Sequence, residues 1–192
     1  MSAARLLEVS QRCADILLSH GPEASTRDLV SASGLSERTF FRMFPTKADS
    51  IRPLLEHGYH RFVSELAARV ESDRTQPLIE AAVAAFLAAF EEPGVGPRPD
   101  LARLLVSAPA YRRVWLEIND DTATALLPVM ASALNLAEDH IDVRLAAAQV
   151  TTLAVTAIRV MVDRGASPED AASAVAASLN RHPLARPIGR VS

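Results

Sequence analysis

The sequence holds a single cysteine and only 7 glycines among its 192 residues. One cysteine cannot form an internal disulfide bond, and it cannot supply a cysteine-rich zinc site. The N-terminal residues lack the basic-then-apolar order of a signal peptide, and no uninterrupted run of about 20 apolar residues is present, so we expect neither export nor a membrane span. A reducing, cytoplasmic location is the default expectation.

Lysine is also scarce, since Lys47 is the only lysine among 20 basic residues, and the formal net charge is −3. The residue in excess is alanine, with 34 copies, and alanine is the best helix former. The apolar fraction of 49% is enough for a buried core and excludes wholesale disorder. Because no strand-like alternation of valine, isoleucine and threonine stands out, the sequence predicts an all-α protein of about nine helices.

Capping residues predict a series of short helices in the first part of the chain. A first helix covers residues 3–20, with apolar side chains at helical spacing. Ser25 opens a second, short helix through a capping box, and a third runs from Ser36 to Met43. A further capping box at Thr46–Asp49 opens a long helix that we expect to end near Ser72.

Prolines and glycines bound the later helices. Pro77 fits the first position of a helix that runs to about Phe90, and the stretch 91–100, rich in proline and glycine, is expected to be a loop. Two helices follow, broken near Pro109, and Pro128 kinks or splits the second of them.

The last two expected helices suit a contact between subunits. One runs from about Glu138 to Arg164 and is apolar on most of its faces, so it would expose an apolar patch unless a second subunit covered it. The other begins at Ser167 and presents small side chains that permit a close helix approach: Ala171, Ala174, Val175 and Ser178. We therefore expect a homodimer through these two helices.

The strongest functional signal lies in residues 25–44. Two short helices flank Ser33-Gly34-Leu35, where the tight turn of a helix-turn-helix needs the left-handed backbone that glycine adopts easily. The small core expected beneath these helices consists of Leu29, Leu35, Phe40 and Phe44. The side chains then left facing outward, where they fit a DNA major groove, are Ser36, Glu37, Arg38, Thr39 and Arg42.

Residues 25–51 resemble the N-terminal domain of the TetR family of transcriptional regulators. Ser33-Gly34-Leu35-Ser36 stands for the family's Ala-Gly-Val-Ser, and Thr39-Phe40-Phe41 stands for its Thr-Leu-Tyr. The remaining matches to the family's pattern are Ser25, Leu29-Val30, Phe44, Pro45 and Lys47. Order and spacing of the pattern both hold over these residues.

The resemblance implies a helix-turn-helix DNA-binding domain over residues 1–48, a ligand-binding and dimerisation domain over residues 49–183, and a loose tail over residues 184–192. It implies a sequence-specific transcriptional regulator that binds palindromic double-stranded DNA as a homodimer. Repression released by a small apolar effector is the family's default. The positions that it implies for DNA contact are Ser25, Thr26, Arg27, Ser36, Glu37, Arg38, Thr39, Phe41, Arg42 and Lys47.

Two positions depart from the family's pattern, because Phe41 and Met43 replace residues that donate hydrogen bonds to DNA phosphates. Neither phenylalanine nor methionine can donate. Phosphate contact then rests more on Arg42, Lys47, Thr39 and the helix N-termini. Either the affinity for DNA is lower than is typical of the family, or the aromatic face packs on sugar.

Charge and side-chain chemistry are compatible with DNA binding. Residues 25–52 hold five basic and three acidic side chains, a local charge of +2 on a mildly acidic protein. Arg38 can pair with a guanine in bidentate fashion, a contact worth about 1–3 kcal/mol of discrimination. Glu37 can accept from a cytosine amine, or it can simply act as a favourable first-turn acid.

In the TetR family the C-terminal bundle holds a ligand pocket. Residues 81–90 are apolar nearly all round and must lie inside. Candidates for the pocket wall, each with ordinary core packing as its alternative, are Phe86, Phe90, Leu104, Tyr111, Trp115 and Met130. Residues 104–117 are similar to a subgroup that binds acyl-CoA-like ligands, which implies an apolar tunnel and an anionic head group held by Arg103, Arg112 or Arg113. We expect no cofactor beyond such an effector.

Two other classes of function compete with this interpretation. An enzyme would use a signature such as a nucleophile elbow, a phosphate loop or a dinucleotide fingerprint, and the sequence contains none of these. His57 and His60 are spaced to share a metal, but no third ligand supports them, so we interpret them as solvated, and Cys13 as a buried structural thiol. A helical protein-interaction module without DNA binding would explain the apolar helices but not the pattern over residues 25–47.

Overall fold

The computed structural model describes residues 2–91 and 98–181. These residues form an all-helical fold, which confirms the predicted fold class. The elements are α1 (Ala3–His20), α2 (Thr26–Ser33), α3 (Glu37–Met43), the 3-10 helix η1 (Lys47–Ile51), α4 (Arg52–Ser72), α5 (Leu78–Ala88), α6 (Pro99–Ser107), α7 (Pro109–Ala125), α8 (Leu127–Leu134), α9 (Ile141–Arg164) and α10 (Pro168–Asn180). The expected tail, residues 184–192, and most of the loop predicted over 91–100 lie outside the described residues.

Most helix start and stop signals act as predicted. Side-chain oxygens of Ser25, Ser36 and Ser167 accept hydrogen bonds from backbone amides in the first turns of α2, α3 and α10. Gly34 and Gly165 end α2 and α9 in the left-handed conformation, with φ angles of 67° and 64°. These caps depend on nearest neighbours in sequence, which is why the sequence predicts them well.

The capping box at Thr46 is present, but it opens the 3-10 helix and not the predicted long α-helix. The amide and hydroxyl of Thr46 donate to Oδ2 of Asp49 at 2.9 and 2.8 Å. An α-helix begun here would run into Pro53, which has no amide hydrogen and whose ring would clash with the carbonyl four residues earlier. α4 therefore begins at Arg52, so that Pro53 falls in its first turn.

Prolines also shift the bounds of the later helices. α6 begins at Pro99, inside the stretch predicted as loop, because the first helical position needs no amide hydrogen. Pro128 lies in the first turn of α8, so the helix predicted after Pro109 is split into α7 and α8, and the described residues hold ten α-helices. α9 begins at Ile141, later than predicted.

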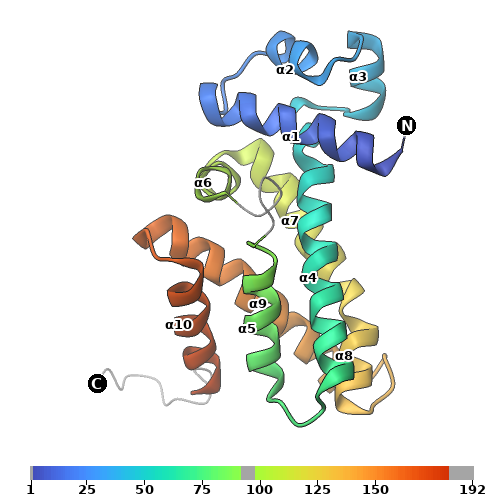
Figure 1. Cartoon of the computed structure of the whole chain (residues 1–192), viewed down its shortest axis with the longest axis vertical. Helices are drawn as coiled ribbons and strands as arrows, with labels where there is room; N and C mark the ends of the chain where they lie inside the picture. The colour runs from blue at the N-terminus through green and yellow to red at the C-terminus, as the bar shows by residue number, and fades with distance from the viewer. Residues whose placement is uncertain (1, 92–97, 182–192) are drawn as a thin grey trace.

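The three N-terminal helices form a small unit at one end of the molecule, and α4 runs from it along a bundle formed by the other helices (Figure 1). In the bundle α4 packs against α5, α7 and α8, while α9 packs against α10, α8, α6 and α7. α1 contacts η1, α4 and α6, and one buried apolar cluster extends from Val9 of α1 to Val175 of α10. The N-terminal unit and the bundle therefore share a core.

Among the described residues, α9 is the one helix that is long and apolar enough to cross a membrane by length and composition. A search for an uninterrupted apolar run misses it, because Arg144 and Arg159 interrupt the sequence. A core helix of a bundle passes the same test. Here α9 buries Val143, Val150 and Leu153 on a face that packs against its neighbours.

Candidate nucleic-acid interface and apolar cavity

Aromatic side chains attach α3 to the rest of the N-terminal unit. Phe40 is fully buried and Phe44 almost fully, and their ring centroids lie 5.2 Å apart in an edge-to-face arrangement. Leu29 of α2 is also buried, and Leu35 packs against the same cluster. The predicted small core is thus confirmed, and it leaves the opposite face of α3 exposed.

The caps of α2 and α3 fix the direction of both helices. Oγ of Ser25 accepts from the amide of Asp28 at 3.2 Å and donates to its carboxylate at 2.7 Å, and the hydrogen bond from Ser25 lowers the pKa of Asp28. Oγ of Ser36 accepts from the amide of Thr39 at 3.2 Å, and the two hydroxyl oxygens lie 2.9 Å apart. The hydroxyls that the pattern assigns to DNA contact therefore also serve as helix caps.

The turn between α2 and α3 depends on Gly34 and on a buried hydroxyl beside it. Ser33 has no exposed surface; its Oγ donates to the carbonyl of Val30 at 2.6 Å and accepts from the amide of Leu35 at 3.1 Å. The left-handed φ of Gly34 turns the chain between these bonds. Together they set the angle between the two helices.

The ten residues predicted to contact DNA gather on α2 and α3, at the caps of these helices, and at the start of η1. Thr26, Thr39 and Lys47 are partly buried. The others are exposed: Ser25, Arg27, Ser36, Glu37, Arg38, Phe41 and Arg42. One continuous part of the N-terminal unit therefore carries all of them.

Lys47 has a structural role that the sequence does not reveal. Its Nζ donates to the carbonyl of Pro22 at 2.8 Å and to the carbonyl of Ala24 at 3.2 Å, so it ties the start of η1 to the turn between α1 and α2. An ammonium group has three donors, and these bonds use two of them. The partners lie more than 20 residues away in sequence, so no local pattern could have found them.

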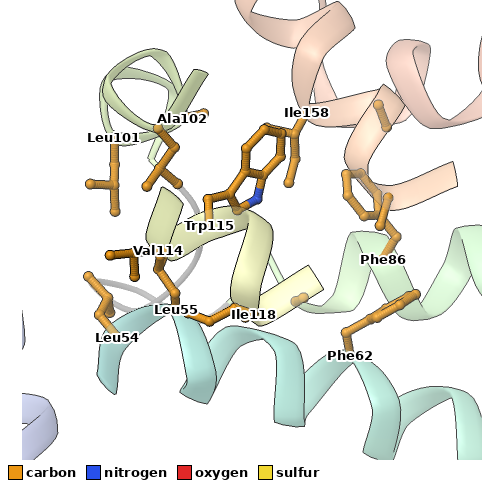
Figure 2. Packing of buried hydrophobic residues seen from close by; sticks show 14 of the residues in the cluster. Leu54, Leu55, Phe62, Phe86, Leu101, Ala102, Val114, Trp115, Ile118 and Ile158 are labelled. Carbon is orange, nitrogen blue, oxygen red and sulfur yellow. The ribbon is translucent and has the colours of Figure 1, made fainter. Parts of the chain in front are cut away.

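An apolar cavity of about 60 Å³ lies in the bundle, between side chains of α4, α5, α6, α7 and α9 and of the residues that follow α5. Figure 2 shows side chains of these helices converging around Trp115. Of the predicted wall residues, Phe86, Phe90 and Trp115 line the cavity. Tyr59 and Phe62 of α4 also line it, although neither was among the predicted wall residues.

The other three predicted wall residues, Leu104, Tyr111 and Met130, are buried but do not line the cavity. Burial is the main cause that raises the pKa of Tyr111 to about 12, and its neighbours Cys13 and Glu23 contribute to that value, so this side chain lies toward α1 and the turn after it. α6, α7 and α8 are packed on more than one side. For such helices apolar character predicts burial and does not predict which neighbour a side chain meets.

A chain of hydrogen bonds adjoins the cavity. Nε1 of Trp115 donates to the hydroxyl of Tyr59 at 2.7 Å, and that hydroxyl donates to Oδ1 of Asn119 at 2.5 Å. Burial raises the pKa of the Tyr59 hydroxyl, so this group stays protonated at neutral pH. The guanidinium of Arg159 lies 5.6 Å from the centroid of the Trp115 ring.

Polar contacts join the bundle to the N-terminal unit. Arg113 of α7 pairs with Asp49 of η1, and Glu117 of α7 pairs with Arg52 at the start of α4. The two α7 residues also pair with each other, at 2.6 Å. In addition, the amide of Leu54 donates to Oγ of Ser10, and Arg98 pairs with Asp15. α1, α4, α6 and α7 are therefore tied together at the junction.

The arginines proposed for an anionic head group are placed elsewhere. Arg103 pairs with Asp100 at 2.8 Å, and Arg113 is occupied by Asp49 and Glu117. None of Arg103, Arg112 and Arg113 lines the apolar cavity. The cavity lining therefore gives no support to the expectation that one of them holds a head group at the mouth of an acyl tunnel.

The faces of α9 and α10 that are predicted to form the contact between subunits are exposed only in part. Ile141 is 70% exposed and Leu145 is 54% exposed, so α9 presents large apolar side chains to solvent. On α10, Ala174 is exposed, but Ala171 and Val175 are buried inside the subunit. These two face α10's own bundle because α10 packs on α5 and α9.

Cys13 is buried, as predicted, and its Sγ lies 3.8 Å from the carbonyl oxygen of Leu29. Burial raises the pKa of this thiol to about 11, so it is protonated at neutral pH. His60 is exposed and His57 is partly buried on α4. Within residues 2–91 and 98–181, no group of three or more potential metal ligands forms around them.

Solved structures match this arrangement over nearly the whole chain. A protein of Syntrophomonas wolfei str. Goettingen, described as a TetR-family transcriptional regulator, superposes with a TM-score of 0.63 at 13% identity and covers 98% of this chain and 97% of its own. One of Rhodococcus sp., described in the same way, gives a TM-score of 0.60 at 16% identity over 94% and 98%. Salmonella enterica GusR gives 0.53 at 15% identity over 93% of each chain.

No family profile and no curated protein sequence matches the chain. The structural likeness gives no support to the acyl-CoA-binding subgroup. What extends over the full length is the arrangement of helices, from the helix-turn-helix unit to the last two helices of the bundle. This chain therefore has the all-helical fold of TetR-family transcriptional regulators.

Proposed function

We propose that this protein is a homodimeric transcriptional regulator that binds palindromic double-stranded DNA through α3 and is controlled by a small apolar effector. The observation that carries the proposal is the exposed outer face of α3, on a helix fixed from behind by Phe40 and Phe44. A rigid helix with exposed charged side chains is what major-groove reading requires.

The side chains on that face have distinct roles in the proposal. Arg38 lies in the first turn of α3, where it can reach the acceptors of a guanine, and Arg42 in the last turn can meet a phosphate. Glu37 suits a cytosine amine. Ser25, Thr26 and Arg27 lie at the N-terminus of α2, which favours phosphate through its backbone amides.

Dimerisation through α9 and α10 would place two copies of α3 on one duplex. Ile141 and Leu145 supply exposed apolar surface for this contact, and Ala174 allows a close approach of helices. Two copies of a reading helix bind half-sites of the DNA that lie about one helical turn apart, roughly 34–36 Å. We propose the division into residues 1–48 for DNA binding and 49–183 for ligand binding and dimerisation on the same basis.

The apolar cavity is the proposed effector site. Its volume of about 60 Å³ is well below the roughly 300 Å³ of typical ligand sites, so an effector must displace side chains or helices to enter. Two of the helices that form its wall, α4 and α7, also carry ion pairs at the junction. In this proposal DNA binds the undisplaced state. An effector that prefers the displaced state then lowers DNA affinity, by at most the difference between its binding free energies for the two states.

Binding to DNA is the first test. A pool of random palindromic duplexes is titrated by fluorescence anisotropy at several salt concentrations, and the bound sequences are selected. We expect salt-dependent binding that weakens strongly in the double variant Arg38→Ala, Arg42→Ala. A matched control removes two exposed arginines from the bundle, Arg103→Ala and Arg112→Ala, and should retain the affinity.

The rival function, a protein-interaction module without DNA binding, predicts another outcome. Wild-type protein would then bind no duplex specifically at any salt concentration, and the two double variants would have the same affinity for DNA. Affinity carried by phosphate contacts falls linearly with salt on a logarithmic scale, with a slope near −0.9 per contact. A smaller slope for the α3 double variant than for the control would identify α3 as the phosphate-contacting element.

A further inference from the structure

Phe41 is an exposed aromatic residue on the outer face of α3, and packing inside the subunit does not explain it. The ring keeps 41% of its surface exposed, whereas Phe40 beside it has none. Among the described residues, the other exposed large apolar side chains lie on α7, on α9 or around the end of α8: Leu116, Leu134, Leu136, Ile141 and Leu145. The proposed subunit contact uses α9 and α10 of the bundle, whereas α3 lies in the N-terminal unit at one end of the molecule, so that contact does not account for Phe41 (Figure 1).

The ring of Phe41 packs against its neighbour Phe40 within the subunit. Its centroid lies 5.6 Å from that of Phe40, with the two planes at 88°. Phe40 is in turn packed on Phe44. An edge-to-face pair of this kind limits the rotation of the outer ring, so Phe41 presents an apolar surface in a defined direction.

Charged side chains surround this apolar surface. Glu37 and Arg38 precede Phe41 by four and three residues, so they lie on the same face of the helix, and Arg42 follows it directly. All three are exposed. Arg38 and Arg42 lie four residues apart, so their guanidinium groups are on the same side of the ring. A face with guanidinium groups beside an apolar ring complements a surface that carries negative charge next to a small apolar group.

The major groove of DNA offers such a group. Its edges carry hydrogen-bond donors and acceptors, and the apolar group among them is the 5-methyl group of thymine. A phenyl ring cannot donate to phosphate or accept from a base. Resting on the proposed DNA-binding function, we propose that Phe41 reads the 5-methyl group of one thymine in each half-site and so determines sequence specificity there.

Replacing thymine by deoxyuridine tests this directly, because it removes the methyl group and leaves every hydrogen-bonding atom in place. Duplexes are made from the selected operator with each thymine replaced in turn, and affinities are measured by fluorescence anisotropy at fixed salt. Burial of one methyl group predicts a roughly fourfold loss of wild-type affinity at one thymine per half-site. Phe41→Ala should bind the two versions of that site equally.

Leu116→Ala is the matched control, because it truncates a comparably exposed apolar side chain on α7 and should retain the preference for thymine. Circular dichroism melting checks that Phe41→Ala is folded, and the wild-type series is decisive even without that variant. Equal affinity of wild-type protein for every deoxyuridine operator, or an operator without thymine, overturns the inference.

A methyl preference that survives in Phe41→Ala also overturns it, and would leave packing on sugar as the role of the ring. Failure of the proposed function looks different. Wild-type protein that binds no duplex in the selection overturns DNA binding and this inference together, whereas a selected operator without methyl dependence overturns only the inference.

Discussion

Arg113 of α7 donates from Nη2 to Oδ1 of Asp49 at 2.8 Å, across the junction between the bundle and the N-terminal unit. The other oxygen of this carboxylate accepts from the amide and the hydroxyl of Thr46, directly after the segment that carries α3. Asp49 is only 8% exposed. A single, nearly buried carboxylate thus links a wall helix of the apolar cavity to the segment that follows the proposed reading helix.

Removing the guanidinium should destabilise the protein more than removing a surface arginine. In Arg113→Met the carboxylate of Asp49 loses its charged partner while it remains nearly buried, and we expect a loss of about 1–2 kcal/mol in the free energy of unfolding. Urea unfolding measures this. Arg103→Met is the control, since its pair with Asp100 is well exposed and such pairs are worth about 0–1 kcal/mol. Equal losses in the two variants would contradict the importance of this link.

The same carboxylate predicts how stability depends on pH. Burial by itself would raise the pKa of Asp49, but hydrogen bonds from Arg113 and Thr46 outweigh it and hold the pKa below its usual value. A lowered pKa in the folded state contributes stability above the unfolded-state pKa, near 4, and that contribution is lost as the pH falls through the folded value. The free energy of unfolding, measured with urea, should therefore fall less between pH 5 and pH 3 for Asp49→Asn than for wild type.

Glu71→Gln serves as the control for that experiment, because it removes an exposed acid near the end of α4. Its stability profile should follow that of wild type. A wild-type profile and an Asp49→Asn profile that fall in parallel below pH 5 would show that this carboxylate does not hold the junction.

Replacing either of two glycines by alanine should have opposite effects on the free energy of unfolding. Gly34 has a φ of 67°, where a Cβ atom is strained, so Gly34→Ala should cost about 1–2 kcal/mol. Gly58 lies inside α4 with open space around its Cβ position, so Gly58→Ala should stabilise by about 0.5–1 kcal/mol. Thermal unfolding compares them. A neutral Gly34→Ala would mean that the turn between α2 and α3 can rearrange.

A charge placed on the exposed face of α9 should separate the proposed dimer. Leu145→Glu puts a carboxylate at a position that a second subunit would bury, and we expect a monomer by light scattering, together with a loss of DNA affinity of at least tenfold. Leu116→Glu, a comparable change at an exposed position of α7, should leave the dimer intact. If Leu145→Glu remains dimeric at micromolar concentration, the subunit contact does not use this face.

Much of the fold could be predicted from local chemistry. Ser25, Ser36 and Ser167 cap helices because each side-chain oxygen meets an amide only three residues away. The exposed face of α3 follows from the same short-range geometry, because Phe40 and Phe44 lie one turn apart and mark the buried side. A sequence contains all the information that such contacts need.

Contacts between distant segments could not be predicted in this way. Lys47 reaches carbonyls of the turn after α1, and Arg113 reaches Asp49 across 64 residues of sequence. The cavity wall shows the same limit: Leu104, Tyr111 and Met130 are buried as expected, yet they meet other neighbours than Phe86 and Trp115 do.

By itself, the sequence determined the helical content, the helix caps, the helix-turn-helix and the outward face that carries Arg38, Phe41 and Arg42. Only the tertiary structure decided which buried side chains enclose the cavity and which ion pairs join the bundle to the N-terminal unit. The physical reason is that hydrophobic burial has no preferred direction, so a helix packed on several sides does not specify its partners until every other helix is in place.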